Sequence, residues 1–128
     1  MVIGTFTTTL CFCMMNTLGL NSQFDLFTQQ ARYNATFGFI NPILSGSVSG
    51  LISYLIKKFL LKTNVGNHLF DMKALCNGFL AGVVAVSVGS GGMQPYYAVL
   101  SGIFAAPCYL FACMIFRNFT IDDPLENC

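Results

Sequence analysis

The chain has 128 residues, of which 55% are hydrophobic and only 9% charged, and its mean hydropathy is +0.66. Soluble domains carry about 25% charged residues, and a domain of this size leaves much of its surface exposed, so the composition is typical of a protein surrounded by lipid. Six basic and five acidic residues nearly cancel, which leaves no basic face for nucleic acid.

Three long stretches lack charge entirely, namely residues 1–24, 33–56 and 74–116. About 20 helical residues cross a hydrocarbon layer of roughly 30 Å. The first two stretches each have room for one crossing and the third has room for two. We therefore predict an all-α integral membrane protein with four transmembrane helices, for which the lipid bilayer is the first partner.

The first predicted helix covers about residues 2–20, and its threonines can donate to carbonyls one turn earlier. It has no basic leader region and no small-residue cleavage site, which argues against a signal peptide. The second covers about residues 35–56, contains Asn41-Pro42 and ends at Lys57-Lys58. A proline inside a spanning helix predicts a kink.

The third and fourth predicted helices cover about residues 74–91 and 97–116, and GGMQPY separates them. Gly89, Gly91 and Gly92 superficially resemble a loop that cradles phosphate. Such a loop follows a strand and precedes a lysine, and neither is present here. A tight turn between two helices is the better interpretation.

Four of the six basic residues fall in one connection, residues 57–73: Lys57, Lys58, Lys62 and Lys73. The positive-inside rule places this loop in the cytoplasm. Both ends of the chain are then cytoplasmic as well. A multi-pass protein, located in the plasma membrane, is the resulting prediction.

Small residues recur at helical spacing on three of the predicted helices. Faces with a small residue at every fourth position let helix backbones approach closely in lipid. The predicted packing glycines are Gly46, Gly50, Gly78, Gly82, Gly89 and Gly102.

Enzyme chemistry is not indicated. His68 lies in the lysine-bearing loop with no nucleophile placed against it. The six cysteines include no CxxC pair and are interpreted as small hydrophobes. No metal or cofactor is therefore expected.

The ending FTIDDPLENC offers two interpretations, an acidic site or the start of a further helix at residues 123–128. Asp123 suits the N-cap, Pro124 the first helical position and Glu126 the third, which together form a capping box. We favour the helix start.

From Asp71 onward, the sequence DMKALCNGFLAGVVAVSVGSGGMQPYYAVLSGIFA and the later IDDPLE resemble the ammonium transporter family, which is related to the Rhesus glycoproteins. Upstream, Gly4-Thr5-Phe6 and Phe39-Ile40-Asn41 are similar to elements of the same family in the same order. The resemblance covers roughly residues 4–126.

This resemblance implies a homotrimer with one pore per subunit and about eleven transmembrane helices, with the present four as the sixth to ninth. It also implies pore-lining roles for Phe12, Met15 and Asn16. Two pore histidines of the family lie on helices outside this chain. The chain is therefore expected to be a fragment of an ammonium or ammonia transporter that does not conduct alone. The alternative is a short four-helix protein that assembles with full-length subunits and modulates them.

Overall fold

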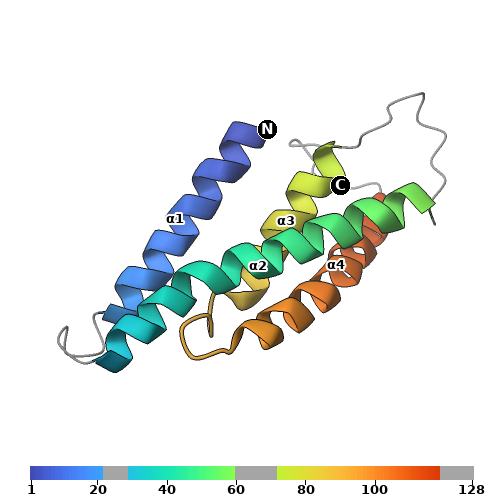
Figure 1. The fold of residues 1–128 in the computed structure, drawn as a ribbon. Coiled ribbons are helices and arrows are strands. Elements are labelled where there is room, and N and C mark those ends of the chain that lie inside the picture. Colours follow the sequence, from blue (N-terminus) through green and yellow to red (C-terminus); the bar gives the residue numbers. More distant parts are fainter. Residues whose placement is uncertain (22–28, 60–71, 119–128) are drawn as a thin grey trace.

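The computed structural model describes residues 1–21, 29–59 and 72–118, which form four α-helices (Figure 1). They are α1 (Val2–Asn21), α2 (Gln29–Phe59), α3 (Met72–Val86) and α4 (Pro95–Asn118). The prediction of an all-helical chain with four helices is confirmed for these residues. Most of the predicted 57–73 loop and all of the predicted helix start at 123–128 lie outside the described residues.

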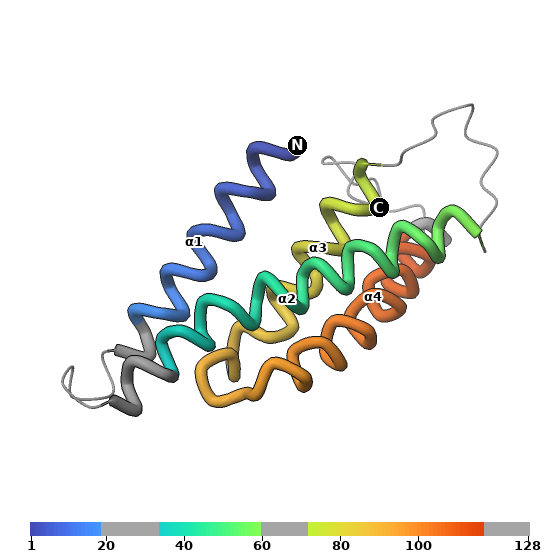
Figure 2. The backbone as a smooth tube through the Cα atoms, viewed as in Figure 1, coloured from blue at the N-terminus to red at the C-terminus, as the bar shows by residue number. Residues whose placement is uncertain are grey.

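The four helices alternate in direction along the chain (Figure 2). The end of α1, the start of α2 and the turn between α3 and α4 lie at one end of the bundle, and the other helix ends lie at the opposite end. α2 contacts each of the other three described helices, whereas α1 contacts α2 and α3 only. α2 is therefore the central element around which the bundle is built.

Two of the described helices contain segments long and apolar enough to cross a membrane, Asn34–Phe59 with 26 residues and Pro95–Phe116 with 22. The apolar parts of α1 and α3, Val2–Leu18 and Met72–Val86, are shorter. The 15 residues of α3 extend about 22 Å at 1.5 Å per residue, which is less than the hydrocarbon thickness.

The third helix ends earlier than predicted, at Val86 rather than at residue 91. After Val86, several amide groups donate to carbonyls three residues back: the Gly89 amide donates to Val86 and the Gly92 amide to Gly89, both at 3.2 Å. Glycine weakens a helix and favours such tight turns. Pro95 then opens α4 at a position where its missing N–H costs little.

Most large apolar side chains of the described helices face outward, and no fully buried side chain in these helices is larger than valine. Asn41, Ser45, Ser49 and Ser53 are fully buried at four-residue spacing along α2. Phe104, by contrast, is 69% exposed. This distribution reverses that of an aqueous core, in which large apolar side chains are buried.

Candidate functional site

Gly82 on α3 lies at one of the closest helix contacts among the described residues. A Cβ atom added there would lie 2.5 Å from the Ser45 carbonyl oxygen, 2.7 Å from Ser49 Cβ and 2.9 Å from Gly46 Cα. Real Cβ atoms do not approach other atoms so closely, so only glycine fits here. The backbones of α2 and α3 therefore meet directly.

Four other glycines that were predicted to lie between helices make similarly close contacts. A Cβ atom on Gly78 would lie 2.5 Å from Ser53 Oγ, and one on Gly102 of α4 would lie 2.6 Å from the Ser45 carbonyl oxygen. On α2, Cβ atoms on Gly46 and Gly50 would lie 2.8 Å from Val83 Cγ2 and 3.0 Å from the Leu75 carbonyl oxygen, respectively. Small residues from three helices thus form one interface.

Gly89 differs from the prediction that it packs between helices. It lies in the turn after α3, and the nearest atom to an added Cβ would be Met93 Cε at an ordinary 3.6 Å. Its role is in the turn itself, because its carbonyl accepts from the amides of Gly92 and Met93, both at 3.2 Å.

The serines on α2 differ in how their hydroxyls are satisfied. Ser45 Oγ donates to the Gly82 carbonyl of α3 at 2.9 Å. The hydroxyls of Ser49 and Ser53 are buried with no hydrogen-bond partner. Small size, rather than hydrogen bonding, is therefore what these two positions require.

Asn41 holds the turn between α3 and α4 against α2. Its Nδ2 donates to the carbonyls of Ser90 at 2.7 Å and Met93 at 2.8 Å. The side chain is completely buried, and its Oδ1 has no partner. A carbonyl in a turn that has no hydrogen-bond partner is costly to bury. The Asn41 amide pairs with two such carbonyls and so fixes the position of the turn. The sequence placed Asn41 beside the proline and in a segment similar to the ammonium transporter family, but its contact with the turn was not predicted.

The contacts between α1 and the rest of the bundle include two weak polar ones from small side chains. Cys13 Sγ lies 3.7 Å from the Phe39 carbonyl oxygen of α2, and Thr5 Oγ1 lies 3.9 Å from Cys76 Sγ of α3. Thr9 donates to the carbonyl of Thr5 at 2.7 Å, one turn earlier, as predicted for the threonines of this helix. Cys13 and Cys76 are buried and free.

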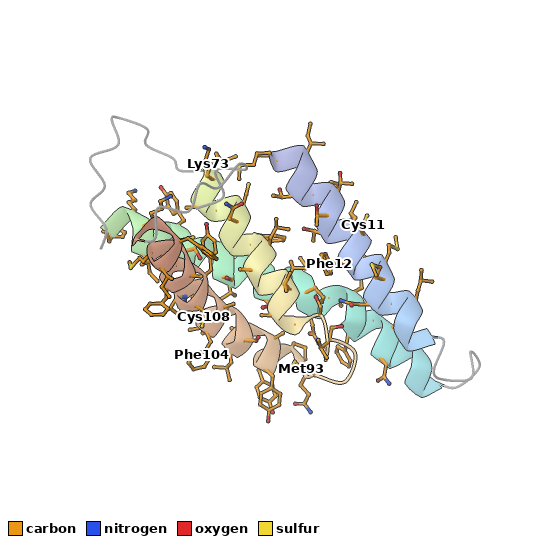
Figure 3. All side chains as sticks on the ribbon, turned by 180° about the vertical axis from the view of Figure 1, so that it is seen from behind. Cys11, Phe12, Lys73, Met93, Phe104 and Cys108 are labelled. Atoms are coloured by element: carbon orange, nitrogen blue, oxygen red, sulfur yellow. The ribbon has the colours of Figure 1, made fainter. Side chains whose placement is uncertain are left out.

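The three residues with pore-lining roles by resemblance lie on one side of α1, since positions separated by three and four residues are neighbours on a helix. Phe12 and Asn16 are half-buried, whereas Met15 is 69% exposed. Phe12 lies on the side of α1 that faces α3 (Figure 3). Asn16 Nδ2 is buried without a partner. The arrangement is an apolar wall with one unpaired amide donor.

The acidic residues at the end of the sequence, Asp123 and Glu126 with Pro124 between them, lie outside the described residues. Their assignment as a helix cap therefore stays a prediction. Within residues 1–21, 29–59 and 72–118, no group of three His, Cys, Asp or Glu side chains could hold a metal ion.

In this chain the helices contact one another through glycine and serine, and large apolar side chains lie on the outside. These features are typical of proteins whose helices pack in lipid. A family model described as the Ammonium Transporter Family matches residues 1–127. The chain belongs to this family, whose members are transporters and not enzymes.

Two relatives from Solanum lycopersicum show how much of a family member this chain represents. "Ammonium transporter 1 member 3" is 32% identical over 87 residues, which cover 68% of this chain and 18% of the relative. "Ammonium transporter 1 member 1" is 29% identical over 87 residues, with coverage of 68% and 17%. The matched part is thus less than a fifth of each relative. No solved structure matches the chain.

Proposed function

We propose that the chain supplies four helices of an ammonium or ammonia transporter and that one side of α1 contributes to its conduction path. The family match over residues 1–127 is the observation on which this proposal depends. The four helices correspond, by the resemblance of their motifs, to the sixth to ninth of about eleven, in a protein that assembles as a trimer in the plasma membrane.

Two features of the structure support a role for α1 in the path. An added Cβ on its Gly4 would have no atom within 4 Å, and its contacts to α2 and α3 include thiol and hydroxyl groups. It also exposes Met15 on one side, next to Asn16, whose Nδ2 is buried without a partner. An apolar wall with an occasional polar group suits the passage of a small, weakly polar species.

The proposed orientation places the end of α2 and the start of α3 in the cytoplasm. Lys57 and Lys58 are in the last turn of α2, and Lys73 is in the first turn of α3. Lysines concentrate on the cytoplasmic side of membrane proteins. Alternation of the helices then puts the turn between α3 and α4 on the outer side.

Uptake of methylammonium by yeast cells without ammonium transporters of their own tests the function. One strain expresses the 128-residue chain, and another expresses the tomato "Ammonium transporter 1 member 3" with its matching segment replaced by this chain. We expect uptake from the chimera and none from the chain alone. A folded, membrane-inserted chimera without uptake would contradict the transport proposal.

Residue roles are tested in the same chimera. Asn16→Leu removes the amide that the structure leaves without a partner on α1, and we expect it to lower uptake. Leu18→Ala is the matched control, because Leu18 is 67% exposed on the same helix and outside the residues assigned to the path. Equal loss in both variants would indicate damage to α1 rather than to a conduction path.

Co-expression separates this proposal from the alternative of a modulating subunit. If the chain co-purifies with the intact tomato protein and changes its uptake, while the chimera is inactive, the modulating role is favoured over the conducting one.

A further inference from the structure

We propose that the lysine-bearing end of α2 is a binding site for one anionic phospholipid, whose headgroup lies at Lys58 and whose acyl chain lies along Leu51 and Leu55. The inference rests on the proposed function only in requiring that the chain lies in a membrane.

The apolar part of this site is a stripe on the outer face of α2. Leu51 is 57% exposed, Leu55 47% and Phe59 67%. They follow one another at four-residue spacing, so they lie on one side of the helix. The buried serines of α2 lie on its opposite side, against α3 and α4. α1 does not cover this half of α2, since the two helices diverge from their shared end (Figure 1).

The polar part lies at the end of the same stripe. Lys58 is three residues after Leu55 and seven after Leu51, so its ammonium group extends from the same side of the helix. Its Nζ lies 5.7 Å from the centre of the Tyr54 ring and 5.8 Å from that of the Phe59 ring. Both distances fall within the range of cation–π contact, so two rings hold the charge where the apolar stripe ends.

Charge complementarity identifies the occupant as anionic. Lys57 adjoins Lys58 in the last turn of α2. Residues 1–21, 29–59 and 72–118 contain no aspartate or glutamate. Asp71 is the one acidic residue between 57 and 73, against four lysines. An anionic headgroup with hydrocarbon chains fits both parts of the site, whereas an acidic protein surface would leave the leucine stripe uncovered.

The site is on the cytoplasmic side in the proposed orientation, and anionic lipids are concentrated in that leaflet. Each basic residue near such a surface contributes roughly 1 kcal/mol, equivalent to about a fivefold change in binding. The stripe and the lysine together would favour an anionic lipid over a zwitterionic one of the same chain length.

Quenching of a single introduced tryptophan by brominated lipids tests the site directly, because the chain has no tryptophan of its own. The 128-residue chain with Phe59→Trp is reconstituted in phosphatidylcholine vesicles that contain brominated phosphatidylglycerol or brominated phosphatidylcholine. A second reporter, Tyr97→Trp, is placed at the start of α4, at the other end of the bundle.

We expect the Phe59→Trp reporter to bind phosphatidylglycerol at least fivefold more strongly than phosphatidylcholine, and the Tyr97→Trp reporter to show little preference. Lys58→Gln should lower the preference at the first reporter several-fold, and Lys58→Arg should keep it. High salt should weaken it, since salt screens exposed charges.

Equal quenching by the two lipids at Phe59→Trp would overturn the lipid site. The lysines would then be assigned to binding an acidic protein surface instead. A preference that persists unchanged in Lys58→Gln would overturn the role of this residue. If neither brominated lipid quenches either reporter, the chain is not in the bilayer, and the failure is that of the proposed membrane location.

Discussion

Replacement of Gly82 by alanine is the sharpest test of the packing described above. The added methyl group would lie 2.5 Å from the Ser45 carbonyl oxygen and 2.9 Å from Gly46 Cα, both backbone atoms of α2. Backbone atoms inside a helix cannot rotate away as a flexible side chain can. α2 and α3 would therefore have to separate by about 1 Å to restore ordinary contact, which forfeits a quarter to a half of the dispersion energy between the separated surfaces.

The size of the effect follows from two opposing terms. Overpacking of this kind costs about 1–3 kcal/mol or more, and alanine stabilises a helix by about 1 kcal/mol relative to glycine. Because the contacts at Gly82 are among the closest in the described structure, we expect the upper end of the first range. The net loss in the free energy of unfolding should be about 2 kcal/mol.

Two alanine variants serve as controls. Gly4 is in the first turn of α1, and Gly92 is in the turn after α3 with φ outside the left-handed region; neither has an atom within 4 Å of an added Cβ. Gly4→Ala measures only the difference in helix propensity between alanine and glycine. Gly92→Ala should leave the free energy of unfolding unchanged within about 0.5 kcal/mol. Loss of helical circular dichroism on titration of mixed micelles with a denaturing detergent gives the three free energies. A Gly82→Ala variant as stable as Gly4→Ala would refute the close backbone approach.

Three further predictions concern polar groups and the wall of α1. Ser45→Ala should lower the free energy of unfolding by roughly 0.6–1 kcal/mol in the same titration, because it removes a hydrogen bond between helices. Ser53→Ala should be neutral or stabilising, because it removes a buried hydroxyl without a partner. A larger loss from Ser53→Ala than from Ser45→Ala would contradict the assigned contacts. Asn41→Leu should leave two turn carbonyls unpaired and speed amide hydrogen exchange in residues 87–93, with unchanged exchange as the contrary result. Met15→Phe in the chimera enlarges the aromatic face of α1, which stabilises cations, so the KM for methylammonium uptake should fall; an unchanged KM would exclude Met15 from the path.

The helix-packing glycines could be predicted from the sequence because their signal is local. Gly78 and Gly82 recur at the spacing of one helical turn, and any helix that includes them places them on one face. Gly89 continues a similar spacing, yet it lies beyond the end of α3. Glycine supports both close helix packing and tight turns, so spacing alone could not show where the helix stops.

The role of Asn41 could not be predicted, because its partners Ser90 and Met93 are 49 and 52 positions away. A signal was nevertheless present. A buried amide in an apolar segment must find partners, since no water is available to pair with it in the hydrocarbon layer. The sequence could therefore indicate that Asn41 is paired, but only the fold shows that it is paired with the turn.

For the cysteines too, exposure follows from local helix geometry, whereas contacts with distant residues do not. Cys11 and Cys13 are two positions apart on α1, and the structure exposes the first and buries the second. This follows from helix geometry alone. The contact between Thr5 and Cys76 joins α1 to α3, and no local pattern specifies it.

The central proposal is that the chain lies in a membrane, and the collision rate of a spin label at residue 104 in the 128-residue chain tests it most directly. Phe104 is 69% exposed on α4. The chain is reconstituted in vesicles with its native cysteines replaced by alanine and a nitroxide attached to Phe104→Cys. Oxygen, which concentrates in lipid, should collide with the label far more often than a water-soluble nickel complex. More frequent collisions with the nickel complex than with oxygen would contradict the account.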